Sequence, residues 1–263
     1  PNAIALAALD TEAELDAIKQ AQSKNIPLIG FDSGVPGAPD GAIKATASTD
    51  NHAAGANAAE HLFPLLEKKL GDKPVRIGVV SQEANSLSIT QRTSGFIDKM
   101  VELLEKKGIK TAVIGHDKFK NKVSESDAKA IIEVRVPAQV DDAAGKTEAS
   151  TVLEKADTIA IYGSNEFAAK AIINANGSFK ESKLGADKIL AVGFDSGALQ
   201  QDAIRNGIFV GSVTRDPIQI GYQAVKLAIE AAQGKEVKDV DTGSKWYDAK
   251  NIDSDEIKPL LYK

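Results

Sequence analysis

Short apolar runs alternate with amphipathic runs along most of the chain. Residues 3–9, AIALAAL, are typical of a buried strand, and residues 11–25 then place apolar side chains at helical spacing. Further strands are predicted at 27–31, 42–48, 75–80, 111–115, 159–163, 189–194 and 208–213, and further helices at 51–63, 91–108, 165–176 and 198–206. Strands that alternate with helices predict βαβ units, and hence parallel sheets with helices on both faces.

The last long helix begins at Asp216-Pro217, where proline suits the first helical position, and Gly234 ends it. Its apolar residues recur at helical spacing and predict one stripe, formed by Ile218, Tyr222, Val225 and Ile229. Pro64 is expected to end or kink the helix at 51–63. We expect a C-terminal strand at 240–248 that contains Trp246.

Two parts of the pattern are irregular. Residues 116–152 are polar and weakly periodic, and we expect a helix, a strand near 131–136 and a surface excursion. The stretch before residue 50 offers only three strands, whereas 75–194 offers about five. In doubly wound sheets the first strand is central. If the chain forms two similar lobes, the first lacks its opening βαβα, on the order of 60 residues, and we therefore expect that an upstream segment exists.

Composition narrows the possible functions. The net charge of −5 does not favour nucleic acid or an anionic membrane surface as a partner. The chain has no cysteine, which excludes disulfides and thiolate chemistry, and its three histidines are too scattered for a metal-ligand spacing. We expect no metal, no cofactor and no catalytic residues.

The pentapeptide GFDSG occurs twice, at 30–34 and at 193–197, each time at the end of an apolar run. Paired catalytic aspartates of a pepsin-like protease are one interpretation, but that architecture is all-β and this chain has clear helices. A plain turn after each strand is a second interpretation. A third is a pair of ligand-binding carboxylates, since ligands bind beyond the carboxyl ends of parallel strands.

Six segments, in order and spacing, resemble the type I periplasmic sugar-binding proteins, the ribose-binding-protein and LacI-core superfamily. They are IPLIGFDSGV (26–35), ATASTDNHAAGANAAEHL (45–62), QRTSGF (91–96), YGSNEFAAKAI (162–172), AVGFDSG (191–197) and SVTRDPIQIGYQAV (212–225). The resemblance covers essentially the whole chain, except that the family's opening strand and helices are absent. It implies α/β architecture with two doubly wound, Rossmann-like lobes joined by a three-strand hinge.

The resemblance also implies a set of ligand-binding residues: Asp32, Ser33, Arg92, Asn165, Asp195 and Arg215. Carboxylate, amide and guanidinium groups bind sugar hydroxyls through hydrogen bonds that are stronger when one partner is charged. Ser33 stands where several relatives have arginine, and Arg215 where the family usually has glutamine. Arg215 could balance an aspartate or select an anionic ligand, and we favour the first because two aspartates already make the cleft acidic. Of the aromatic residues, Phe167 and Trp246 are expected to serve packing or the hinge.

The implied lobes are residues 1–49 with 216–242, and 50–215 with 243–263. A sugar would be captured between them by hinge closure, without turnover, and passed to the membrane permease of an ABC transporter. We expect a monomer in the periplasm or outside the cell, with a lipid anchor as one alternative, and no nucleic-acid partner. The rival hypotheses are the effector-binding core of a LacI-type regulator, with a DNA-binding headpiece upstream, and a doubly wound enzyme acting on a sugar or nucleoside.

Overall fold

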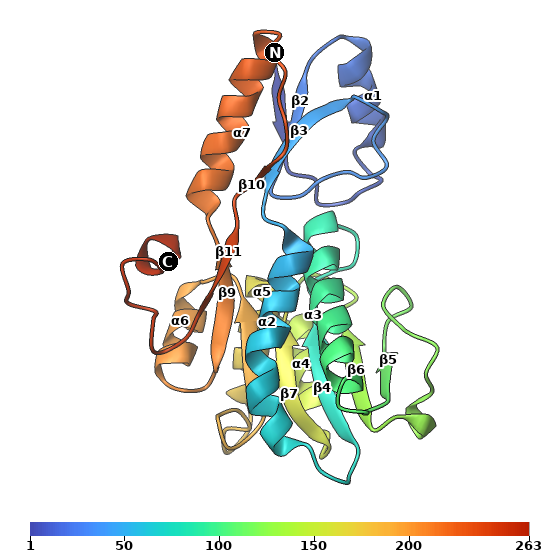
Figure 1. The fold of residues 1–263 in the computed structure, drawn as a ribbon, viewed down its shortest axis with the longest axis vertical. Helices are drawn as coiled ribbons and strands as arrows, with labels where there is room; N and C mark the ends of the chain where they lie inside the picture. Colours follow the sequence, from blue (N-terminus) through green and yellow to red (C-terminus); the bar gives the residue numbers. More distant parts are fainter. Residues whose placement is uncertain (263) are drawn as a thin grey trace. The chain divides into compact units, whose positions relative to one another are not determined.

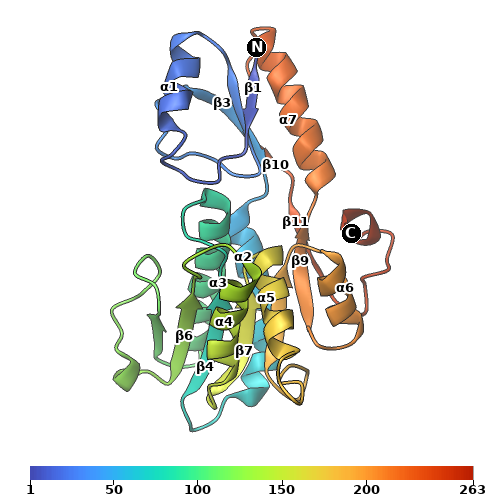
Figure 2. The ribbon, with the colours of Figure 1, turned by 180° about the vertical axis from the view of Figure 1, so that it is seen from behind.

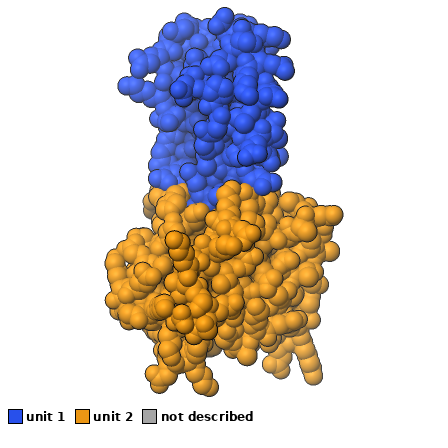
Figure 3. All heavy atoms as spheres, turned by 90° about the vertical axis from the view of Figure 1, so that its right-hand side faces the viewer, with its two compact units in different colours: residues 1–51, 85–91, 215–244 blue, residues 52–84, 92–214, 245–263 orange. Residues whose placement is uncertain are grey.

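The computed structural model describes residues 1–262, and the chain folds into two compact units (Figure 3). Unit 1 consists of residues 1–51, 85–91 and 215–244, and unit 2 consists of 52–84, 92–214 and the chain from Lys245 onward. Both units are mixed α/β structures built on parallel strands, as the alternating pattern predicts.

Unit 1 has a four-stranded sheet with one main helix on each face (Figure 1). Its order is β1-β2-β3-β10, with β1 at Ile4–Leu6, β2 at Leu28–Phe31, β3 at Ile43–Ser48 and β10 at Val240–Asp241. Successive residues of a strand point to opposite faces. Leu28 therefore packs with α1 (Leu15–Ser23), while Ile29 packs with α7 (Pro217–Ala232).

Unit 2 contains a seven-stranded sheet of order β11-β9-β8-β7-β4-β6-β5. The strands are β4 (Val75–Val80), β5 (Thr111–Ile114), β6 (Ala130–Arg135), β7 (Thr158–Gly163), β8 (Leu190–Phe194), β9 (Gly211–Arg215) and β11 (Ser244–Tyr247). The central strand β4 is buried along its whole length. Because β6 lies on one side of β4 and β7 on the other, strand order reverses at β4, which is where doubly wound sheets bind ligands.

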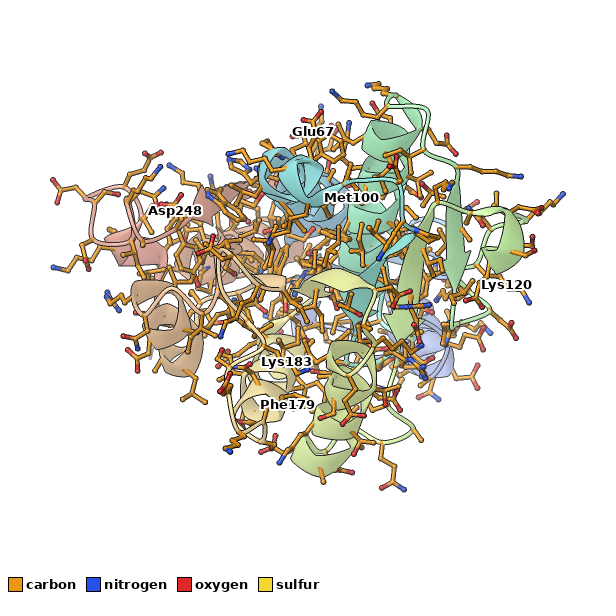
Figure 4. All side chains as sticks on the ribbon, turned by 90° about the horizontal axis from the view of Figure 1, so that it is seen from below. Glu67, Met100, Lys120, Phe179, Lys183 and Asp248 are labelled. Atoms are coloured by element: carbon orange, nitrogen blue, oxygen red, sulfur yellow. The ribbon has the colours of Figure 1, made fainter. Side chains whose placement is uncertain are left out.

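Helices cover both faces of the unit 2 sheet (Figures 1 and 2). On one face lie α2 (Asn51–Leu66) and α3 (Leu87–Glu105), and on the other lie α4 (Asp142–Leu153) and α5 (Glu166–Asn176), with α6 (Ala198–Arg205) nearby. Met100 of α3 is fully buried between helix and sheet, whereas Lys120 lies at the periphery of the unit (Figure 4). Short 3₁₀ turns lie at Glu67–Lys69, Glu125–Asp127 and Lys258–Leu260.

Several boundaries differ from the sequence predictions. Helix α2 continues two residues past Pro64, to Leu66. The proline lies in the last turn of the helix, and the buried side chain of Leu66 holds that turn against the core. The expected strand at 240–248 is two strands in different sheets, since Gly243 turns the chain between them with a φ of +76°. The segment 116–152 forms β6 and nearly all of α4, as expected for a strand near 131–136 and a helix, and it has a 3₁₀ turn before them.

The apolar stripe predicted on α7 is the largest difference. Its four residues, Ile218, Tyr222, Val225 and Ile229, are all exposed, by 53% to 70%. The helix instead packs on the sheet through Ile220, Ala224 and Leu227. Periodicity therefore identified a real apolar face, but not the face that contacts the described part of unit 1.

Glu133 of β6 is a buried carboxylate surrounded by cations in unit 2. It is 2% exposed and accepts hydrogen bonds from Arg76, from Arg135 at 2.8 Å and from Lys155 at 2.6 Å. Although burial raises its pKa, the hydrogen bonds and charges of Lys155 and Arg135 hold the pKa of Glu133 below its usual value of 4.5. The ionised carboxylate therefore stabilises the fold at neutral pH.

We predict that Glu133→Gln lowers the free energy of unfolding by about 3 kcal/mol at pH 7, because cations remain buried without their counter-charge. A depressed carboxyl pKa stabilises the fold above the unfolded value and loses its contribution as the pH falls below about 4.5. The free energies of unfolding of the variant and the wild type, measured by urea denaturation, should therefore become more similar as the pH falls from 7 to 3. Glu102→Gln is the matched control, since Glu102 pairs with Lys106 on an exposed helix surface. Equal effects of both substitutions at pH 7 would contradict this assignment.

Candidate functional site

The two GFDSG copies fold into the same local structure. Asp32 follows β2 and Asp195 follows β8, and both have positive φ, +59° and +73°. Among the other described residues that are not glycine, only Asn25 shares this conformation. Each aspartate donates its backbone N–H to the neighbouring parallel strand, Asp32 to Ala47 at 3.0 Å and Asp195 to Val213 at 2.8 Å. Non-glycine residues in this region are strained by about 1–3 kcal/mol, and such strain is concentrated at functional sites.

In unit 1, Asp32 is paired with Arg215. A guanidinium nitrogen of Arg215, at the end of β9, donates to the Asp32 carboxylate, and both side chains are partly buried. Ser33 is buried beside them, and its hydroxyl accepts the backbone N–H of Ser88 at 3.2 Å. Three of the six predicted residues therefore lie together in unit 1.

A cavity of about 460 Å³ lies next to this group and is lined by unit 1 residues alone. Its oxygen-bearing side chains include Asp32, Asp50, Asp239 and Asp241, with the hydroxyls of Ser33, Thr46, Ser48, Thr49 and Ser88. Two of these carboxylates also hold the backbone: Asp239 accepts the N–H of Thr46 at 2.8 Å, and Asp241 accepts the N–H of Asp50 at 3.0 Å. The wall is thus rich in acceptors for hydroxyl donors.

In unit 2, Asp195 is paired with Arg92. The Asp195 carboxylate lies 3.5 Å from a guanidinium nitrogen of Arg92 and accepts the backbone N–H of Glu166 at 3.2 Å. Its carbonyl oxygen accepts from the hydroxyl of Tyr247 at 2.8 Å and from Gln200 at 3.1 Å. Asp195 is 5% exposed, so contacts on every side fix its position.

Arg92 is positioned by the second turn of α3. The helix begins at Leu87, four residues before the predicted start at residue 91, so the predicted start is wrong. The Arg92 side chain is 3% exposed, and its guanidinium carbon lies 4.2 Å from the centre of the Phe194 ring. A guanidinium group over an aromatic face is favourable, and its N–H groups can still donate hydrogen bonds in the guanidinium plane.

Asn165 caps helix α5 beside the order reversal of the unit 2 sheet. Its side-chain oxygen accepts the N–H of Ala168 at 3.0 Å, and its amide nitrogen donates to Gln82 at 2.7 Å. Because residue 166 contacts Asp195, Asn165 belongs to the same group as Asp195 and Arg92. The structure thus places the six predicted residues in two groups of three, one in each unit.

Sequence reasoning missed several residues of these groups. Gln82 follows β4 and carries no motif signal, while Asp241 belongs to the tripeptide DTG at 241–243, which resembles the DSG of the two repeats. Trp246 stacks on His61, with ring centres 4.5 Å apart, and Phe167 covers Gly145 of α4, so both aromatic residues serve packing within unit 2. Within residues 1–262 there is no group of three or more His, Cys, Asp and Glu side chains that could hold a metal ion.

Tyr162 of β7 lies close to the unit 2 group. Its ring stacks on Phe96 with centres 4.1 Å apart, and burial raises the pKa of its hydroxyl. In the described part of the chain, this hydroxyl has no hydrogen-bond partner.

We predict that Tyr162→Phe leaves the free energy of unfolding unchanged or raises it by about 1 kcal/mol, because it removes an unsatisfied buried hydroxyl. The control is Tyr247→Phe, which removes the hydrogen bond to the Asp195 carbonyl and should lower stability by about 1 kcal/mol. Urea denaturation of the two variants measures both effects. A loss of stability in Tyr162→Phe equal to that in Tyr247→Phe would show that the hydroxyl has a partner.

Comparisons with known proteins identify the family. The family model described as "Periplasmic binding protein domain" matches residues 1–236. The chain therefore belongs to the periplasmic binding protein family, which has a solute-binding fold. A search of curated proteins gives no match. Within residues 1–262, no helix is both long enough and apolar enough to cross a membrane.

Solved structures give the same fold. A Brachyspira murdochii protein, described as "ABC transporter, LacI family transcriptional regulator", is 38% identical with a TM-score of 0.83, over 100% of this chain and 81% of its own. An ABC transporter solute-binding protein from Agrobacterium vitis with bound D-fucose is 26% identical with a TM-score of 0.78, over 99% and 79%. The periplasmic component of an ABC-type sugar transport system from Hahella chejuensis is 26% identical with a TM-score of 0.72, over 94% and 78%.

Proposed function

We propose that this protein is the substrate-binding component of an ABC transporter and that it binds a monosaccharide or related polyol. The observation that carries the proposal is the matched pair of Asp–Arg groups, Asp32 with Arg215 and Asp195 with Arg92, each at the carboxyl end of a parallel strand. Bound D-fucose in the Agrobacterium vitis structure supports the ligand class.

The chemistry of the two groups suits a neutral, hydroxyl-rich ligand. An ionised carboxylate accepts two or more hydroxyl protons, and a guanidinium donates to adjacent ring or hydroxyl oxygens. Asn165 can both donate and accept, which matches the dual character of a hydroxyl. Because Arg215 already contacts Asp32, its charge is balanced within unit 1, and it does not require an anionic sugar.

The proposed mechanism is hinge closure on the ligand. Each unit supplies one half-site, and a sugar that contacts both half-sites stabilises the closed arrangement relative to the open one. The lobes would comprise residues 1–49 with 216–242 and 50–215 with 243–263, whereas the compact units described above place residues 85–91 and Arg215 with unit 1. A membrane permease would then recognise the closed form of a monomeric protein in the periplasm, and no chemical step on the sugar is expected.

The effector-binding core of a LacI-type regulator is the second candidate. It is favoured by one observation, namely that the Brachyspira murdochii protein is described both as an ABC transporter and as a LacI family regulator. The same half-sites would then bind an effector sugar and control affinity for DNA.

We predict that a thermal-shift screen of pentoses, hexoses, 6-deoxyhexoses and inositols will find at least one ligand that raises the Tm. A ligand present at about 100 times its Kd stabilises the folded state by about 2.7 kcal/mol. Uronic acids of the same ring geometry are the control and should give smaller shifts, because the unit 1 wall is acidic. Turnover of any sugar, detected by chromatography, would contradict a binding role. Sugar-dependent DNA binding by the full-length gene product would support the regulator.

We predict that Asp195→Ala and Arg92→Ala each weaken the affinity for the ligand found in that screen by about 10- to 100-fold, since hydrogen bonds to charged groups contribute about 1.5–3 kcal/mol. Asp195→Asn keeps the shape of the side chain and separates lost charge from lost packing. Isothermal titration calorimetry measures the affinity, and circular dichroism confirms the fold of each variant. Glu102→Gln is the surface control, and unchanged affinity in both folded alanine variants would remove the site assignment.

A further inference from the structure

Three neighbouring strands of the unit 2 sheet, β8, β7 and β4, each lead into a polar side chain at the same level. In the pairing of β4 with β7, Val80 lies opposite Gly163. Two residues further on, the same register places Gln82 opposite Asn165. The pairing of β7 with β8, continued in the same way, places Asn165 opposite Asp195. Gln82 is therefore the third member of a row that already contains two predicted ligand-binding residues.

The end of β4 is held in place by buried hydroxyl groups. Ser81 is fully buried, and its Oγ accepts from the hydroxyl of Ser164 at 3.1 Å. The proton of Ser81 is donated to the carbonyl oxygen of Glu83 at 3.1 Å, and the hydroxyl of Thr93 lies 3.2 Å away. Since a hydroxyl has one proton and two acceptor sites, Thr93 must be the second donor to Ser81. These bonds fix the backbone directly before Gln82.

The amide groups of Asn165 and Gln82 have only one consistent orientation. The side-chain oxygen of Asn165 caps helix α5 by accepting the N–H of Ala168, so its amide nitrogen must face Gln82. That nitrogen donates to the side-chain oxygen of Gln82 at 2.7 Å. The Nε2 atom of Gln82 is not used in this contact, and no group in residues 1–262 accepts from its two N–H donors. Gln82 is only partly buried, so a ligand can reach these donors.

We propose that Gln82 binds the sugar in the unit 2 half-site as a hydrogen-bond donor only, an inference that rests on the proposed function. Along the row, the carboxylate of Asp195 accepts, Asn165 can donate and accept, and Gln82 donates. Gln82 thus recognises a sugar oxygen that acts as an acceptor, either the ring oxygen or a hydroxyl oxygen whose own proton is bound elsewhere. The alternative is that Gln82 only holds Asn165, which requires the side-chain oxygen of Gln82 and not its nitrogen.

The substitution Gln82→Glu separates these two roles. It keeps an oxygen that accepts from Asn165 and removes both N–H donors, with almost no change in shape. We expect the Kd for the sugar to rise about 10-fold, because a hydrogen bond is lost and a carboxylate oxygen faces another acceptor. The Tm should stay within about 2 °C of the wild-type value, because the bond from Asn165 is retained. Gln139→Glu is the matched control, since it adds the same charge at an exposed position of unit 2.

The probe is the sugar that gives the largest thermal shift among D-ribose, D-xylose, D-glucose, D-galactose, D-fucose and myo-inositol. Isothermal titration calorimetry then measures its Kd for the wild type and for both variants. An unchanged Kd in Gln82→Glu would show that Gln82 only holds Asn165, and it would overturn this proposal while the proposed function stands. If none of these sugars binds the wild type, the proposed function fails and the role of Gln82 fails with it.

Nuclear magnetic resonance gives a second measurement that needs no variant to fold. In a proton–nitrogen correlation spectrum of the wild type, the two side-chain N–H signals of Gln82 should shift when the sugar saturates the protein, and these protons should exchange more slowly with water. The side-chain signals of Gln139 should not change. Gln82 signals that stay unchanged at saturation would overturn the proposal.

Discussion

Each candidate half-site depends on an aspartate that the backbone holds in a left-handed conformation at the end of a parallel strand. In an extended conformation, Asp32 and Asp195 would continue their strands and place their carboxylates on a sheet face. Positive φ turns the chain and directs both carboxylates to the edge of the sheet. The hydrogen bond from each aspartate N–H to the next strand holds this turn against its strain. The repeated serine and glycine then complete the turn.

The two half-sites share this geometry but differ in rigidity. Asp195 is almost fully buried, and its carboxylate and carbonyl both have several partners. Its partner Arg92 is held in place by α3 and by the ring of Phe194. Asp32 is more exposed, and its partner Arg215 lies where a strand passes into a helix. The surface around Asp195 is thus preformed and that around Asp32 more hydrated, so the costs of ordering a binding group are greater in unit 1.

Much of the fold was predictable because the strands of unit 2 are short, apolar and regularly spaced. The strand ends carrying Asp32, Asp195 and Asn165 followed from the same pattern, and the structure places them in the expected local settings. Other features depend on contacts that a single sequence does not display. The exposure of the apolar stripe on α7 depends on which face of the helix packs on the sheet. The sequence pattern of the stripe is the same whether the stripe is buried or exposed. The early start of α3 at Leu87 and the contact between Asn165 and Gln82 are likewise tertiary in origin.

The charged cluster around Glu133 has a consequence for how strand β6 finds its place. In the observed alignment, Glu133 lies opposite Gly78 of β4 and shares a sheet face with Arg76. Slippage of β6 by one residue would rotate every side chain to the other face of the sheet. Glu133 would then enter the apolar cluster beneath α2 and α3, where an unpaired carboxylate costs several kcal/mol. A single polar residue thus discriminates against a misaligned sheet, in a strand whose remaining side chains are mostly interchangeable aliphatic groups.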